Sequence, residues 1–134
     1  MHMMATNLNI SGSAGPQAYA TFTCTQDSAY GFPLKKDCAA ALDKVSPVTP
    51  QACTKQFQAE YNCVTVGTCT IHTYSSRGMA HCLDHGLMIR GGKDILARCT
   101  FTQGYSSEEY TEGQYEWTAH GSSEGIKFVK ASIV

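Results

Sequence analysis

The sequence contains no apolar run that approaches the ~20 residues needed to cross a bilayer, so a membrane span is not expected. It also lacks a basic excess, because the formal net charge is −1 and the lysines and arginines are scattered. General nucleic-acid-binding proteins carry a clear basic patch, so nucleic acid is not an expected partner. Residues 1–18 lack the apolar stretch of a signal peptide and are mostly small or polar, which predicts a flexible leader.

No two cysteines form a C-x-x-C pair, which argues against the usual zinc and thioredoxin signatures. Cysteine itself is frequent, and dispersed cysteines in a small chain are typical of a disulfide framework made in an oxidising compartment. We therefore expect a secreted protein. The odd number leaves at least one cysteine without an intrachain partner, and this cysteine permits a covalent homodimer. The disulfide candidates are Cys24, Cys38, Cys53, Cys63, Cys69, Cys82 and Cys99.

The remaining pattern predicts one disulfide-stapled α+β domain over residues 19–134, with an antiparallel sheet and two or three helices packed on one face. Apolar residues at helical spacing predict a helix over 34–45. A second helix is expected from near Lys93 or Asp94, and a shorter one within 51–63. The segment 79–89 fits either a strand or a loop.

Strands are expected where apolar and β-branched residues alternate. The segment 63–74 is read either as two strands that turn near Gly67 or as one strand with a bulge. Between the second helix and the C-terminal strands, a polar loop is expected over 102–114. The other expected strands cover 18–24, 115–121 and 126–134, the last two joined by a turn at 121–125.

Several cysteines occupy positions suited to joining helices to a sheet. Cys38 and Cys99 fall on the apolar sides of the predicted helices, and Cys63 and Cys69 flank the turn-like region, where we expect structural roles. Each closed loop would stabilise the fold by about 2–4 kcal/mol. Two arrangements stay open: Cys38 pairs with Cys99, or each of them pairs with a strand cysteine.

A pattern of cysteines and helix starts is formed by Asp37-Cys38 with Ala41-Leu42, Cys69-Thr70-Ile71, and Asp94-Ile95-Leu96 with Cys99. This pattern resembles that of small secreted fungal proteins, in particular the killer-toxin-like effectors, which resemble virus-encoded killer toxins of smut fungi. The resemblance covers roughly residues 20–130. It implies an α/β sandwich held by disulfides, export from a fungus to the host apoplast or cell, and virulence or antagonism.

This resemblance implies binding rather than catalysis, and it carries over no catalytic residue and no cofactor. The implied partner is a protein or cell-surface component of a host or a competitor, or a partner effector. Metal binding is the other chemistry to weigh, because His81, Cys82 and His85, with His72, have the residue types of a zinc site. A cysteine held in a disulfide cannot ligate a metal, so no metal site is expected.

The sharpest enzymatic alternative is a small secreted ribonuclease-like hydrolase that uses Glu116 and His120. These residues alternate with their neighbours on a predicted strand, so they share one face, where a carboxylate and an imidazole can act as base and acid. The run Tyr115 to Trp117 resembles the glutamate strand of small fungal guanyl-specific ribonucleases, and His72 fits the earlier histidine of that family. The arginine that the family needs after this strand is absent.

The segment from Tyr105 to Glu116 is acidic and contains no basic residue. Its tyrosines, Tyr105, Tyr110 and Tyr115, make it a candidate recognition element, because exposed aromatic side chains favour interfaces. The alternative that stays open is that these tyrosines pack at the base of the loop.

Overall fold

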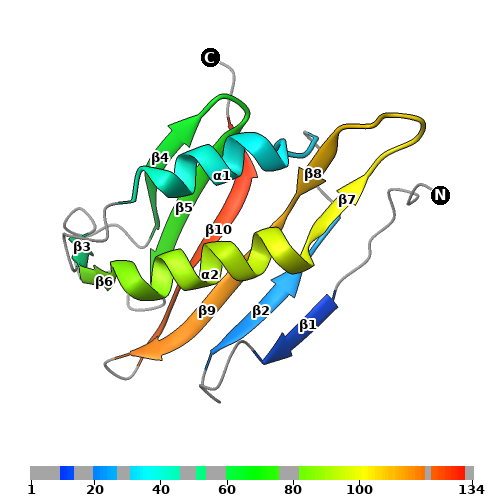
Figure 1. Cartoon of the computed structure of the whole chain (residues 1–134). Helices are drawn as coiled ribbons and strands as arrows, with labels where there is room; N and C mark the ends of the chain where they lie inside the picture. The colour runs from blue at the N-terminus through cyan, green and yellow to red at the C-terminus, as the bar shows by residue number, and fades with distance from the viewer. Residues whose placement is uncertain are drawn as a thin grey trace.

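The computed structural model describes residues 10–13, 20–26, 31–45, 51–53, 60–75, 82–119 and 122–131. A six-stranded antiparallel sheet carries two helices on one of its faces (Figure 1). The prediction of a disulfide-stapled α+β domain is therefore confirmed. None of the described helices is both long and apolar enough to span a membrane.

The main sheet has the strand order β1-β2-β9-β10-β5-β4, and all neighbouring strands run antiparallel. Two short antiparallel pairs, β3 with β6 and β7 with β8, lie outside it. The strands of the sheet are β1 (Ile10–Ser13), β2 (Thr21–Cys24), β4 (Glu60–Val66), β5 (Cys69–Ser75), β9 (Gly113–Ala119) and β10 (Ser122–Lys130). The short strands are β3 (Gln51–Cys53), β6 (Cys82–Asp84), β7 (Thr100–Thr102) and β8 (Glu109–Thr111).

Alternation along the central strands decides which face of the sheet is buried. Tyr115 and Trp117 of β9 are almost fully buried, whereas Glu116 between them is only half-buried. Ile126 and Phe128 of β10 follow the same rule. Successive side chains of a strand point to opposite faces, so the core forms between the sheet and the helices. We call the face opposite the helices the outer face.

Two helices cover the inner face: α1 (Lys35–Asp43) and α2 (His85–Arg98). α2 lies very close to the sheet, because a Cβ atom added at Gly91 would stand 2.8 Å from Cβ of Tyr115. One added at Gly92 would stand 2.6 Å from Cδ1 of Leu42 in α1. Glycine is thus required at Gly91, where the helix passes the root of the Tyr115 side chain.

Each disulfide joins one helical segment to one strand. Cys38 of α1 bonds Cys69 of β5, and Cys99, just after α2, bonds Cys24 of β2. The Cα atoms are 5.1 Å apart in both pairs. Pairing of each helix cysteine with a strand cysteine is confirmed, and the Cys38–Cys99 pairing is wrong, because both cysteines face the sheet rather than one another.

The turn between β4 and β5 is docked on the first turn of α1. The Asp37 carboxylate accepts hydrogen bonds from the Thr68 hydroxyl at 2.6 Å and from the Thr68 backbone N–H at 2.8 Å. These two bonds hold the pKa of Asp37 below its usual value, and the bond from the hydroxyl has the larger effect. Gly67 has φ +53° and leaves no room for a side chain beside this carboxylate. The prediction of two strands turning near Gly67 is confirmed.

Some predicted boundaries are wrong. α2 begins at His85 rather than near Lys93, because Gly91 and Gly92 permit close packing instead of ending a helix. The helix expected within 51–63 is wrong at both ends, where β3 and β4 pair with other strands. Pairing across a sheet overrides local helical spacing.

The turn expected at 121–125 and the leader also need correction. Residues 122–125 extend β10 and pair with β9, and residues 109–111 of the expected loop form β8. Ile10–Ser13 pairs with β2 as the edge strand β1, so this part of the predicted flexible leader belongs to the sheet. The rest of 1–18 lies outside the described residues.

We predict that Gly91→Ala destabilises the fold, although alanine favours a helix by about 1 kcal/mol over glycine. The added methyl group meets the Cβ–Cγ root of Tyr115, which has little freedom to move, and overpacking of this kind costs about 1–3 kcal/mol. The midpoint of urea denaturation under oxidising conditions should fall. Gly86→Ala, at an exposed position in the first turn of α2, is the matched control and should not lower it.

Candidate functional site

The β7–β8 hairpin projects at the edge of the molecule (Figure 1). Its connecting segment, 103–108, holds Tyr105, whose side chain is fully exposed (101%). Among the described residues, Tyr105 is the only exposed large hydrophobic side chain. An aromatic ring held in water at a hairpin tip is a feature of recognition surfaces.

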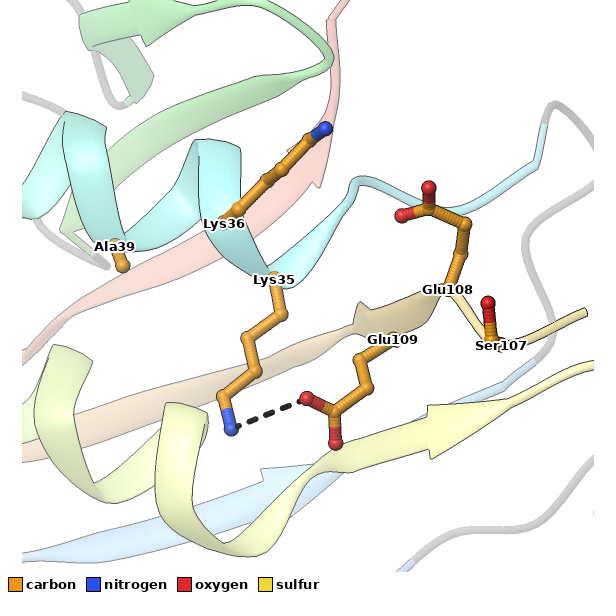
Figure 2. A pocket seen from close by; sticks show the side chains of 6 residues that line it. All are labelled: Lys35, Lys36, Ala39, Ser107, Glu108 and Glu109. Atoms are coloured by element: carbon orange, nitrogen blue, oxygen red, sulfur yellow. Dashed lines mark ion pairs between the residues drawn. The ribbon is translucent and has the colours of Figure 1, made fainter.

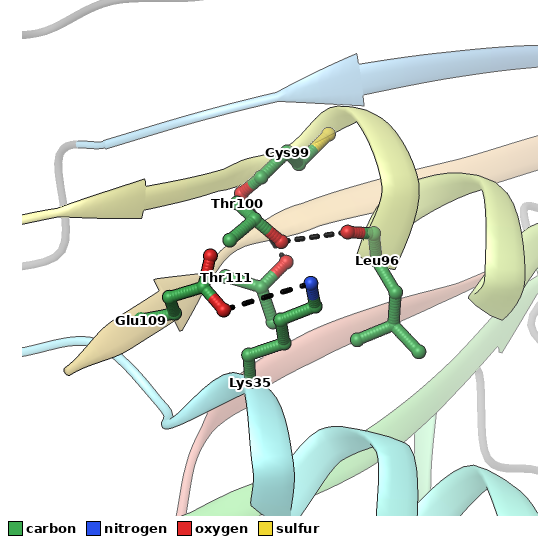
Figure 3. A network of polar contacts seen from close by, with 6 residues as sticks. All are labelled: Lys35, Leu96, Cys99, Thr100, Glu109 and Thr111. Atoms are coloured by element: carbon green, nitrogen blue, oxygen red, sulfur yellow. Dashed lines mark hydrogen bonds and ion pairs between the residues drawn. The ribbon is translucent and has the colours of Figure 1, made fainter.

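The base of this hairpin is rigid. Phe101 of β7 is buried and packs edge-on against Phe32, with 4.9 Å between ring centroids. The Thr111 hydroxyl donates to the Cys99 carbonyl at 3.2 Å, and the Thr100 hydroxyl donates to the Leu96 carbonyl at 2.6 Å (Figure 3). Because Cys99 is also disulfide-bonded, the point where the hairpin leaves the core is fixed.

The hairpin is also attached to the segment that leads into α1. The Thr111 backbone N–H donates to the Pro33 carbonyl at 3.1 Å, and Leu34 forms an isolated antiparallel bridge with Tyr110. Lys35 Nζ lies 3.8 Å from Glu109 Oε1 (Figures 2 and 3). This ion pair is exposed and contributes about 0–1 kcal/mol, so the backbone contacts carry the attachment.

An open groove lies between the start of α1 and β8, with a volume of about 360 Å³. Figure 2 shows Lys35 and Glu109 facing each other across it, while Lys36 points away from this ion pair. Neither Lys36 nor Glu108 forms an ion pair within the described part of the chain, which leaves one charge of each sign for a partner. The groove is lined by Lys35, Lys36, Ala39, Ser107, Glu108 and Glu109.

The three tyrosines proposed from the sequence occupy different environments. Tyr105 is exposed, Tyr110 is half-buried with its ring 6.1 Å from that of Phe101, and Tyr115 is fully buried. Tyr115 lies in the core because alternation along β9 turns it toward α2. Tyr115 is therefore not available to a partner. For this residue, the alternative that the tyrosine packs inside the protein is correct.

A second group of polar side chains lies on the outer face. The Tyr74 hydroxyl of β5 donates to Glu116 Oε1 of β9 at 2.9 Å, across the intervening strand β10. Gly125 of β10 is in register with both residues, and a side chain there would collide with the Tyr74 ring. Lys127 Nζ lies 5.6 Å from the centroid of the same ring. Burial, followed by the bond to Glu116 and the charge of Glu116, raises the pKa of Tyr74 above its ordinary value.

His72 shares the outer face with Tyr74, because Ile71 and Thr73 on either side of it are buried inward. It is in register with Lys127. The structure thus brings His72 and Glu116 of the hydrolase hypothesis to one face, whereas His120 lies outside the described residues. The spacing of His72 and Tyr74 in the sequence indicates that both side chains share one face of the strand. Only the strand register shows that Lys127 lies on the same face beside them.

The remaining candidates belong to metal and disulfide chemistry. Among the described residues, no group of three His, Cys, Asp or Glu side chains is placed to hold a metal ion. His85 is buried in the first turn of α2, and His81 lies outside the described residues. The structure describes the backbone of Cys53, Cys63 and Cys82, and all three lie in strands.

Comparison with protein-family models, with curated proteins and with solved structures finds no match. No relative therefore lends a function to this chain.

We predict that Tyr74 makes stability sensitive to alkaline pH. Below its unfolded pKa of 10.0 the hydroxyl is protonated in both the folded and the unfolded chain, so its contribution is fully present. Above that pH the unfolded chain ionises first, because the folded pKa is raised, and the free energy of unfolding falls as pH rises. Tyr74→Phe should be less stable by about 1–2 kcal/mol at neutral pH but should show a shallower alkaline decline.

Urea denaturation of thiol-alkylated protein across the alkaline range measures this slope. Tyr105→Phe, which removes an exposed tyrosine hydroxyl, is the matched control and should keep the wild-type slope. If the free energy of unfolding of Tyr74→Phe falls with pH as steeply as that of the wild type, ionisation of Tyr74 is not the cause of the alkaline decline.

Proposed function

We propose that the protein is a secreted binding protein, a fungal effector of the killer-toxin-like kind that the cysteine pattern resembles. In this proposal it docks the β7–β8 hairpin onto a protein or cell-surface component of a host or competitor. The observation that supports this function best is the fully exposed Tyr105 on a hairpin whose base is immobilised.

Rigidity matters because ordering a loop on binding costs free energy. The strands of the hairpin are attached on both sides, β7 to the end of α2 and β8 to the segment before α1. Within the connection that carries Tyr105, the Ser106 backbone N–H donates to the Gln103 carbonyl at 3.1 Å, so little of the hairpin is left to order on binding. A tyrosine has few rotatable bonds and a large contact area, so it binds at a low entropic cost.

The groove beside the hairpin supplies the polar part of this surface. Lys36 and Glu108 lie on its two sides and present opposite charges. Exposed charges around an aromatic residue affect orientation and association rate more than affinity. We therefore assign affinity to Tyr105 and orientation to these two charges.

Two disulfides support the export that the proposal requires. Cys24–Cys99 and Cys38–Cys69 connect distant segments and lie in the core, with Cys38 and Cys69 fully buried. Stable cross-links of this kind persist in oxidising compartments and are rare in the cytosol of most organisms.

The binding proposal predicts saturable binding of N-terminally labelled protein to intact plant cells or to fungal cells. Tyr105→Ala should weaken this binding about tenfold or more, as truncation of an aromatic hot spot does. Tyr105→Phe should retain most of the affinity, because the ring area remains. Lys93→Ala, an exposed change in the middle of α2, is the control for nonspecific effects. Equal binding of Tyr105→Ala and wild type would refute the assigned surface.

A second candidate function is a secreted ribonuclease-like hydrolase. The observation that favours it is the gathering of Glu116, Tyr74, His72 and Lys127 on the outer face. A carboxylate can act as a general base, and a lysine can stabilise the negative charge of a phosphoryl transition state. In the structure the Glu116 carboxylate accepts the Tyr74 hydroxyl proton, so a substrate hydroxyl would have to compete with this bond.

Purified protein incubated with RNA separates the two functions. Under the binding proposal we expect no degradation above that of a buffer control. Degradation that is lost in both Glu116→Gln and His120→Ala would replace the binding proposal with the hydrolase. Gln114→Ala, a half-buried residue on the same strand and face as Glu116, is the matched control and should behave as wild type in either outcome.

A further inference from the structure

The antiparallel pair β3·β6 places Cys53 directly opposite Cys82. The other partners in this register are Gln51 with Asp84 and Ala52 with Leu83. Two cysteines from segments far apart in the sequence therefore meet at one position of a two-stranded sheet. The register follows from the backbone, and the inference below uses that placement alone.

The Cα separation of two residues that face each other on antiparallel strands suits a disulfide. Opposite residues have Cα atoms about 4.5–5.5 Å apart. Disulfides accept Cα separations of about 4.4–6.8 Å, and the two bonds already present have 5.1 Å. No backbone movement is needed to bring the Cα atoms of Cys53 and Cys82 within this range.

We propose that Cys53 and Cys82 form a third disulfide, which makes Cys63 the single cysteine without an intrachain partner. The other four cysteines are already paired as Cys24–Cys99 and Cys38–Cys69. Cys63 lies in β4, at the edge of the main sheet, where the register with β5 shifts between Asn62 and Val64. Any covalent homodimer of this chain therefore runs through Cys63.

The cross-link forms by exchange with a disulfide donor, such as oxidised glutathione or an oxidised thiol oxidoreductase of the secretory route. One cysteine thiolate attacks the donor disulfide, and the resulting mixed disulfide is resolved by the second cysteine. The Sγ–Sγ bond between Cys53 and Cys82 forms while the donor S–S bond breaks. The donor receives two electrons and two protons and leaves as two thiols.

The proposed bond gives α2 a cross-link at each end. Cys82 stands just before the first residue of α2, His85, and Cys99 follows the last residue, Arg98. The bond to Cys53 would tie the start of α2 to the segment that follows α1. The helix that packs on Tyr115 would then be cross-linked near both termini, to β2 of the main sheet through Cys99 and to β3 through Cys82.

Thiol labelling and peptide mapping of the full-length protein test the proposal. The protein is refolded with mixed oxidised and reduced glutathione, its free thiols are alkylated under denaturing conditions, and it is digested at acidic pH without reduction. We expect one alkylated cysteine, Cys63, and a disulfide-linked peptide pair containing Cys53 and Cys82. Alkylation of both Cys53 and Cys82, or a linked pair joining Cys63 to either of them, would overturn the proposal.

Three single variants sharpen the assignment. Cys63→Ser should contain no reactive thiol and should denature at the wild-type temperature. Cys53→Ser should expose two reactive thiols, at Cys63 and Cys82, and Cys82→Ser should expose them at Cys53 and Cys63, with a lowered melting temperature in both. If a cross-link variant does not fold, the map of the wild-type protein still decides. A Cys63→Ser protein in which Cys53 and Cys82 both react would refute the third bond.

Discussion

The disulfide between Cys24 and Cys99 is the constraint on which the candidate recognition surface depends. It fixes the end of α2 to β2, and the chain enters β7 at the next residue. The Cys99 carbonyl also accepts the Thr111 hydroxyl of β8, so the same residue holds both strands of the hairpin. The hairpin therefore leaves the core in a fixed direction, and it carries Tyr105 in its connecting segment.

Close packing on the inner face has a consequence for the outer face. α2 approaches the sheet closely at Gly91, and the side chains of Tyr115 and Trp117 are almost fully buried on the inner face. Alternation then forces Glu116 outward, where Gly125 lets Tyr74 reach across β10 to bond it. The polar cluster on the outer face is therefore built by the same strand that builds the core. The hairpin and the cluster are separate surfaces with different chemistry, which is why one supports recognition and the other suggests hydrolysis.

Elements with a strong local signal were predictable from the sequence. The spacing of Cys38, Ala41 and Leu42 identified α1, and the β-branched residues around Gly67 identified β4 and β5. α2 was predicted too short because Gly91 and Gly92 normally disfavour a helix. Their value arises only from the nearness of Tyr115 and Leu42, which no local window contains. β3 was missed because its stability comes from pairing with β6, far along the chain.

The class of the fold, its use of disulfides, and the set of polar and aromatic residues available for function could be inferred from the amino-acid sequence alone. These properties follow from composition and short-range periodicity, which each segment carries alone. Three further properties are visible only in the folded chain: which cysteines pair, which of the three tyrosines reaches the surface, and that Lys127 and Tyr74 lie beside Glu116. Those outcomes depend on strand order and register, which arise from contacts between residues distant in sequence.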